Sequence, residues 1–133
     1  MIQIGHVLAI ALFFFFAGSA TAAPLAYTCE VLHIYDLSEK GTLKASAFEK
    51  EMKGSSFSVS RVTGEIVGEV LPTILAKSTR VVNNGSTKNS FKAVADFEEQ
   101  FQVLEVQEFR SGSAKPFVAS SMGGAGIVTG TCK

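Results

Sequence analysis

The stretch Tyr27-Thr28-Cys29-Glu30-Val31 decides the fold, because Cys29 has one possible partner in the sequence, Cys132, the second residue from the C-terminus. Two cysteines in an exported chain are typical of a disulfide, since the compartments on the export route are oxidising. A crosslink between these two positions closes nearly the whole chain into a ring, which the chain-entropy model values at about 4 to 5 kcal/mol. The alternative is a pair of unpaired buried thiols.

An apolar segment near the N-terminus predicts export. Residues 1–22 contain no Asp, Glu, Lys or Arg, and residues 7–17 read VLAIALFFFFA. This run has the length of a signal-peptide core and is too short to span a bilayer, which takes about 20 apolar residues. We expect a signal peptide at residues 1–22, cleaved after Ala22, and a single domain at residues 23–133 that is periplasmic or secreted. A retained anchor is the alternative, since the run follows no Lys or Arg.

The charge balance argues against two classes of partner. Twelve Lys and Arg match twelve Asp and Glu, so the formal net charge is zero. No basic excess is present to displace counterions from phosphate, and we expect no binding to nucleic acid. A polybasic membrane patch is missing for the same reason, so we expect no stable membrane insertion once the signal peptide is removed.

The hydrophobic pattern predicts an all-β fold. Residues 26–36 are rich in aromatic and β-branched side chains and are predicted as a long strand, with Tyr27, Cys29, Val31, His33 and Tyr35 on one face. One short helix is expected near residues 45–53, where Phe48 and Met52 are spaced i,i+4 and Gly54 follows. The remaining strands are expected at residues 42–46, 56–62, 65–70, 79–82, 90–97, 101–109, 116–121 and 127–132.

Eight or nine short strands with frequent turn signals are typical of a β-barrel or a sandwich. We expect a small antiparallel barrel or barrel-like roll, because closure removes exposed edges and a disulfide would join the first and last strands. Turns are predicted at Asn83-Asn84-Gly85 and in the glycine-rich stretch at residues 122–126. Phe101 and Val103 share one face while Leu104 and Val106 share the other, which indicates a bulge or a strand buried on both sides.

Few residue types that carry catalysis are present. His33 is the one histidine after residue 22, and no spacing selects a Ser or a carboxylate to accompany it. With both cysteines expected in a disulfide, ligands for a metal site are lacking, and no cofactor is expected. The acidic residues Asp96, Glu98 and Glu99 lack the pattern of a calcium loop and are expected to form a solvated turn. We therefore expect a protein that is not an enzyme.

Several stretches resemble an uncharacterised family of small exported proteobacterial β proteins. They are Tyr27-Thr28-Cys29-Glu30-Val31, Phe57-Ser58-Val59-Ser60-Arg61-Val62-Thr63-Gly64, Ser90-Phe91-Lys92-Ala93, Lys115-Pro116-Phe117 and Thr129-Gly130-Thr131-Cys132. The early Tyr-x-Cys and the late cysteine are also similar to the periplasmic inhibitors of c-type lysozyme. Those small barrels insert a Ser-Gly loop with a basic residue into the lysozyme cleft. That likeness implies an interaction loop with contacts at Ser111, Gly112 and Lys115.

The expected function is that of a non-enzymatic binding or interaction module, because a rigid disulfide-closed scaffold presents loops well. Its partner is unknown from the sequence and is expected to be another exported protein. Inhibition of a cell-wall hydrolase such as c-type lysozyme is one alternative. Carriage of a small ligand is another, and it would require a hollow barrel interior.

Overall fold

A computed structural model of the protein describes residues 23–121 and 126–133. The predicted signal peptide at residues 1–22 lies outside the described residues. So does the predicted glycine-rich turn, apart from Gly126.

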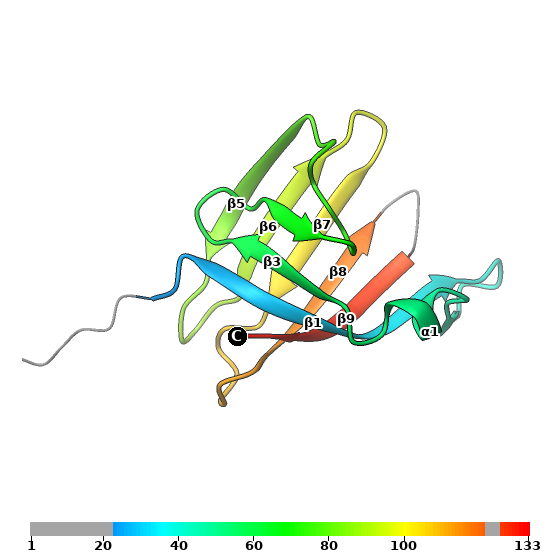
Figure 1. Ribbon diagram of the computed structural model, residues 1–133, viewed down its shortest axis with the longest axis horizontal. Coiled ribbons are helices and arrows are strands. Elements are labelled where there is room, and N and C mark those ends of the chain that lie inside the picture. Colours follow the sequence, from blue (N-terminus) through cyan, green and yellow to red (C-terminus); the bar gives the residue numbers. More distant parts are fainter. Residues whose placement is uncertain (1–22, 122–125) are drawn as a thin grey trace, which may run out of the picture.

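The described chain forms nine strands and one short helix, which confirms the predicted all-β fold (Figure 1). The helix, α1 (Glu49–Met52), is shorter than the predicted segment and packs beside the first strand. The strands are β1 (Ala26–Leu37), β2 (Leu43–Ala45), β3 (Ser56–Ser60), β4 (Ile66–Gly68), β5 (Ser78–Asn84), β6 (Phe91–Asp96), β7 (Phe101–Val106), β8 (Lys115–Ser121) and β9 (Gly126–Cys132).

The strands form one antiparallel sheet in the order β4-β3-β1-β9-β8-β7-β6-β5, with β2 paired to β1. The sheet curls so that β1, β3 and β4 pass in front of β5 to β8 in Figure 1. The predicted barrel-like roll is confirmed as a curled half-barrel. Its two terminal strands, β4 and β5, are not paired with each other. The first and last strands are neighbours in the middle of the sheet, so the disulfide does not form the closing seam.

The disulfide predicted between Cys29 and Cys132 is present and buried. The two cysteines are register partners on β1 and β9, with Cα atoms 3.9 Å apart. Next to them, Thr28 and Lys133 exchange two backbone hydrogen bonds of 2.9 Å. The crosslink therefore fixes the chain end to the central strand of the sheet.

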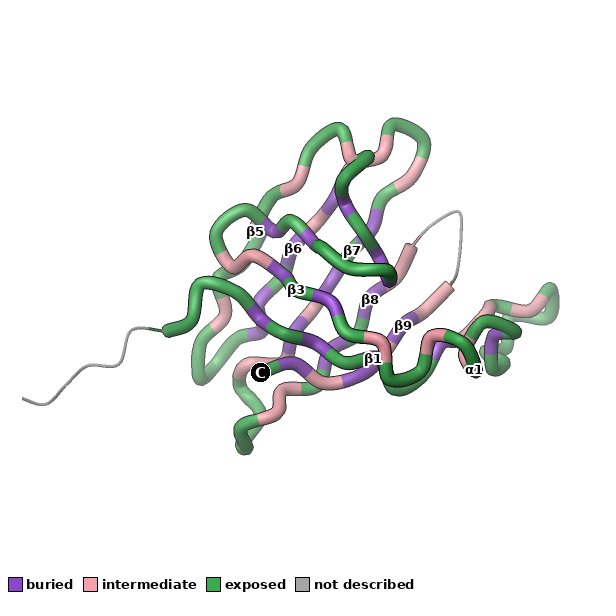
Figure 2. Tube along the Cα trace, viewed as in Figure 1, coloured by how far each residue is buried: buried purple, intermediate pink, exposed green. Residues whose placement is uncertain are grey.

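Buried residues alternate with more exposed ones along most strands of the sheet, and no residue of β2 or β5 is buried (Figure 2). Phe57 and Phe117 meet edge to face at 5.3 Å, as do Tyr27 and Phe91 at 5.1 Å. Such pairs add packing energy beyond their buried area. Where Leu104 lies opposite the end of β4, the remaining space is too small for a water molecule. This part of the interior is packed rather than hollow.

Two sequence-based assignments of strand faces are wrong. The pairing of β1 with β9 slips between Val31 and His33, so Ile34 is buried while His33 is exposed and Tyr35 is half-buried. A bulge of this kind adds one residue and reverses the alternation beyond it. The face predicted to carry Tyr27, Cys29, Val31, His33 and Tyr35 therefore ends at Val31.

Strand β7 shows the opposite error. Its pairing with β6 is unbroken, so it carries no bulge, and it is not buried on both sides. Leu104 and Val106 face the core, whereas Phe101 and Val103 face outward. The inner position before Leu104 is occupied by Gln102, a buried polar residue.

The turn predicted at Asn83-Asn84-Gly85 is also wrong in its position. Both asparagines belong to β5, which contains a bulge between Val81 and Asn83. The Asn83 side chain accepts a hydrogen bond of 2.9 Å from the Gly85 N–H. This local bond stabilises the strand end and places the turn after Gly85.

Candidate functional site

The seam between β4 and β5 is where the curled sheet remains open, and its two ends are built differently (Figure 1). At one end, the turn from β3 to β4 lies against β5. At the other end lies the connection at residues 69–77 that joins β4 to β5, beside the turn from β6 to β7. We call these the sealed end and the open end.

The sealed end begins with a close backbone approach at Gly64. This glycine has φ of +77°, a conformation that other residues rarely adopt. A Cβ atom added there would lie 3.2 Å from the carbonyl group of Arg80 and 3.1 Å from the Cβ of Ala93. The turn therefore needs glycine both for its conformation and for its contact with β5.

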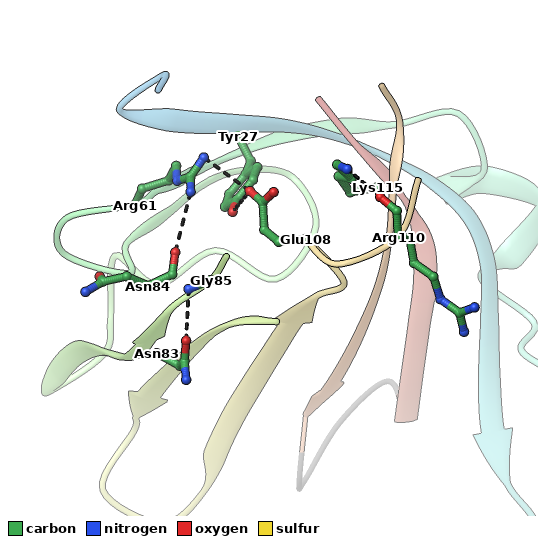
Figure 3. Close-up of polar contacts among 8 residues, drawn as sticks. All are labelled: Tyr27, Arg61, Asn83, Asn84, Gly85, Glu108, Arg110 and Lys115. Atoms are coloured by element: carbon green, nitrogen blue, oxygen red, sulfur yellow. Dashed lines mark hydrogen bonds and ion pairs between the residues drawn. The ribbon is translucent and has the colours of Figure 1, made fainter. Parts of the chain in front are cut away.

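A polar cluster completes the sealed end (Figure 3). Arg61 Nη2 donates to the Asn84 carbonyl oxygen at 3.4 Å, and Nη1 lies 3.2 Å from Glu108 Oε1. The guanidinium also stands 4.6 Å above the ring of Tyr27, whose hydroxyl donates to Glu108. Through Arg61 the β3–β4 turn is thus joined to β1, to β5 and to the segment after β7.

Tyr27 acts in this cluster as a neutral hydrogen-bond donor. Burial raises the pKa of its hydroxyl well above the usual value of 10, and the hydrogen bond to Glu108 raises it further. The charge of Arg61 lowers it only in part. The phenol therefore keeps its proton near neutral pH, and its role is to hold the cluster together by hydrogen bonding.

The open end contains a groove of about 500 Å³, within the range of ligand sites in proteins. Its lining has a few polar members and a majority of small or apolar ones. They come from β4, from the connection and from the first residues of β5: Glu65, Ile66, Val67, Gly68, Pro72, Thr73, Ile74, Ala76, Lys77, Ser78 and Thr79.

Backbone hydrogen bonds hold the connection in place. Thr73 forms hydrogen bonds with both backbone groups of Ile66 that point away from β3. Its Oγ1 accepts from the Ile66 N–H at 2.8 Å, and its own N–H donates to the Ile66 carbonyl at 3.1 Å. The Gln102 side chain donates to the Leu71 carbonyl at 2.7 Å. The Lys77 N–H donates to the Asp96 carbonyl, also at 2.7 Å. The connection is therefore fixed at both ends and in its middle.

Side chains between these fixed points are displayed to solvent. Ile74 and Leu75 are 88% and 86% exposed, and Val67 on β4 is 72% exposed. Apolar side chains this exposed on an ordered loop are typical of a binding surface when they lie together beside a groove. We call these three residues the apolar lip.

Acidic residues gather at the same end of the seam as the apolar lip. Glu65 lines the groove, Glu69 follows β4, and the β6–β7 turn places Asp96, Glu98 and Glu99 beside the connection. The turn is tight, since Asp96 Oδ1 accepts the Glu98 N–H at 3.0 Å and Glu98 has φ of +68°. These five residues form what we call the acidic rim. Among the described residues, none of the three ion pairs of the protein involves it.

The interaction loop predicted from the sequence lies elsewhere. Ser111 and Gly112 lie in the β7–β8 loop and Lys115 begins β8, at the opposite end of β7 from the β6–β7 turn. Ser111 and Gly112 are exposed, and Lys115 Nζ donates to the Arg110 carbonyl of the same loop at 2.5 Å (Figure 3). The structure places the three residues in and beside one loop but not at the groove.

His33 is exposed on β1, where the bulge turns it outward. Its Nδ1 lies 3.6 Å from Glu49 Oε1, and its ring stacks on Tyr35 at 5.8 Å. Within residues 23–121 and 126–133, no group of three or more His, Cys, Asp or Glu side chains is placed to hold a metal ion. Among the helices that the structure describes, none is long and apolar enough to cross a membrane.

Sequence reasoning missed both ends of the seam. The Arg61 cluster joins residues far apart in the chain, and no local pattern reveals such a cluster. The apolar lip had a visible signal, because Ile74 and Leu75 follow Pro72 in a stretch without strand or helix periodicity. An aliphatic pair in a loop either packs into the core or is exposed on the surface. The sequence does not show which, because only the solvent exposure of the two side chains distinguishes them.

Comparison with known proteins gives no relative: no family model, no curated protein and no solved structure matches the chain. The resemblance to small exported proteobacterial proteins and to lysozyme inhibitors therefore stays a prediction.

Proposed function

We propose that this protein is an exported, non-enzymatic binding module that holds its partner at the open end of the seam. The observation that carries the proposal is the apolar lip: three strongly exposed aliphatic side chains, of which Val67 and Ile74 line a groove of about 500 Å³. The lining residues of the groove include no histidine and no cysteine, so the proposal assigns binding rather than catalysis to it.

Export is supported by two features. The disulfide between Cys29 and Cys132 is buried in the middle of the sheet, and disulfides form and persist in oxidising compartments. The apolar run at residues 7–17 has the length of a signal-peptide core. A periplasmic or secreted location agrees with both.

A surface site is favoured over carriage of a small ligand inside the barrel. The interior around Leu104 and Gln102 has no room for a water molecule, whereas the groove opens to solvent. The partner is therefore expected to be another exported macromolecule that contributes its own apolar side chains.

The test is selection of peptides from a random displayed library on the purified, disulfide-bonded protein. Selected peptides should lose at least about tenfold in affinity for the double variant Ile74→Ser/Leu75→Ser. The matched control is Leu37→Ser/Leu43→Ser, which removes two exposed, cross-strand leucines on β1 and β2. Equal binding to both double variants would contradict the proposal.

A further inference from the structure

We propose that the partner segment bound at the open end is a cationic, amphipathic peptide of another protein. Its apolar side chains would pack on the apolar lip and fill the groove, and its Lys or Arg side chains would meet the acidic rim. This inference rests on the proposed function and adds the chemical class of the partner.

The charge of the rim carries the first step. Of the five carboxylates of the rim, one lines the groove, one follows β4 and three belong to the turn beside the connection, whereas Lys77 is the one base among the residues that line the groove. The chain as a whole has zero formal net charge. The acidic excess is therefore local to this end and is not a by-product of an acidic protein.

The arrangement of the rim carries the second step. Glu98 and Glu99 are adjacent, exposed and held in a tight turn, so their like charges stay close together. Since the ion pairs within the described residues do not involve them, their charges face solvent. A partner that brings Lys or Arg gains most from Glu98 and Glu99, since Glu65 and Asp96 already accept hydrogen bonds within the protein, whereas an acidic partner is repelled.

The backbone of the connection carries the third step. Thr73 already satisfies the outward N–H and carbonyl of Ile66, and the β3–β4 turn lies on β5 near Arg80. The edge of β4 is therefore covered at Ile66, and the edge of β5 near Arg80, which leaves a partner strand little continuous edge to pair with. The partner is recognised by side chains placed in the groove and on the rim rather than by addition of a strand.

A membrane surface fits these features less well than a peptide. Bacterial lipid surfaces carry anionic headgroups, and the acidic rim would be repelled from them as the apolar lip approached. The same rim attracts a cationic protein segment. Lipid binding is therefore an outcome that would overturn the inference.

The experiment is a fluorescence-anisotropy titration with three labelled synthetic peptides of equal length. One alternates lysine and leucine, the second alternates glutamate and leucine, and the third alternates lysine and serine. We expect the lysine–leucine peptide to bind at least about tenfold more tightly than either of the others. Its affinity should fall about three- to tenfold as salt rises from roughly 50 to roughly 300 mM, because exposed charges are screened.

Two double variants and two matched controls locate the binding. Glu98→Gln/Glu99→Gln should weaken the lysine–leucine peptide about three- to tenfold, and Ile74→Ser/Leu75→Ser at least about tenfold. Glu39→Gln/Glu51→Gln removes the same charge from the exposed region around β2 and α1, and it should leave affinity unchanged. Leu37→Ser/Leu43→Ser should also leave it unchanged. Thermal unfolding of each variant shows that it is folded.

The outcomes separate the inference from the proposed function. Equal, lip-dependent binding of the glutamate–leucine peptide would overturn the cationic partner and leave the groove as the binding site. If Ile74→Ser/Leu75→Ser does not change the affinity for the lysine–leucine peptide, both the cationic partner and the proposed binding site would be overturned. Lip-dependent binding to vesicles of phosphatidylglycerol and phosphatidylethanolamine, at an affinity equal to that for the peptide, would replace the peptide by a lipid surface.

Discussion

The two ends of the β4–β5 seam differ in how the unpaired edges of these two strands are covered. At the sealed end, Gly64 and Arg61 cover the edge of β5 with a backbone contact and a hydrogen bond, and Arg61 also forms an ion pair with Glu108 after β7. At the open end, Thr73 hydrogen-bonds Ile66 at the edge of β4 through its hydroxyl and its backbone N–H, while Ile74 and Leu75 are exposed. Both ends are ordered and both expose aliphatic side chains, since Val62 in the β3–β4 turn is 69% exposed, but only at the open end do such side chains line a groove. The open end is thus an ordered surface that exposes apolar side chains, and not merely a gap in the barrel.

Removal of the disulfide should have the largest effect, and it should act on both ends alike. Cys29→Ala/Cys132→Ala opens a loop of 103 residues, so we expect the free energy of unfolding to fall by about 4 kcal/mol. Urea unfolding followed by circular dichroism measures this loss. A loss below about 1 kcal/mol would show that the central strands hold the two ends of the seam without the crosslink.

Gly64→Val should break the sealed end. The new side chain meets the carbonyl of Arg80 and the Cβ of Ala93 and also strains a positive φ, so we expect a loss of about 3 kcal/mol. Gly41→Val is the matched control, since Gly41 has φ of +75° and no atom within 4 Å of the added Cβ. It should lose only about 1 to 2 kcal/mol, from backbone strain alone. If urea unfolding gives equal losses of unfolding free energy for the two variants, the close contact of Gly64 with β5 does not contribute to stability.

Tyr27→Phe should weaken the polar cluster at the sealed end. Loss of the hydroxyl leaves Glu108 without one partner, and we expect a cost of about 1 to 2 kcal/mol at neutral pH. Because the pKa of Tyr27 is raised in the folded protein, its stabilisation is complete below the usual value of 10 and is lost as the pH rises above it. The difference between wild type and variant should therefore narrow above pH 10. A difference that stays constant to higher pH contradicts the raised pKa.

The double variant Ile74→Ser/Leu75→Ser should have the smallest effect on stability. Both side chains are displayed to solvent, so the free energy of unfolding should change by no more than about 0.5 kcal/mol. The same variant should lose peptide binding. If it instead unfolds at clearly lower urea, the pair serves the fold and the contrast between the two ends fails.

Local patterns predicted much of the fold. The alternation of Phe91, Ala93 and Ala95 set the inner face of β6, and the two cysteines set the crosslink. The bulge after Val31 could not be predicted, because it arises from the register between β1 and β9. The burial of Gln102 could not be predicted for a similar reason. It is buried because a carbonyl 31 residues away accepts its hydrogen bond.

The candidate site was predictable only in fragments. The acidic residues Asp96, Glu98 and Glu99 were recognised as a polar turn, but nothing in the chain order shows that this turn lies beside Ile74 and Leu75. Two backbone-directed hydrogen bonds, from Gln102 to Leu71 and from Lys77 to Asp96, create that proximity. Charge and apolar surface become one site only through the curl of the sheet.

The most direct test of the central claim is a map of backbone amide chemical shifts during titration with the lysine–leucine peptide. We expect the largest changes at residues 66–68, 73–79 and 97–99, around the groove and the acidic rim. Arg61, Asn84 and Glu108 at the sealed end should stay unchanged. Changes concentrated at the sealed end, or at Ser111, Gly112 and Lys115 in and beside the β7–β8 loop, would contradict the assignment of binding to the open end.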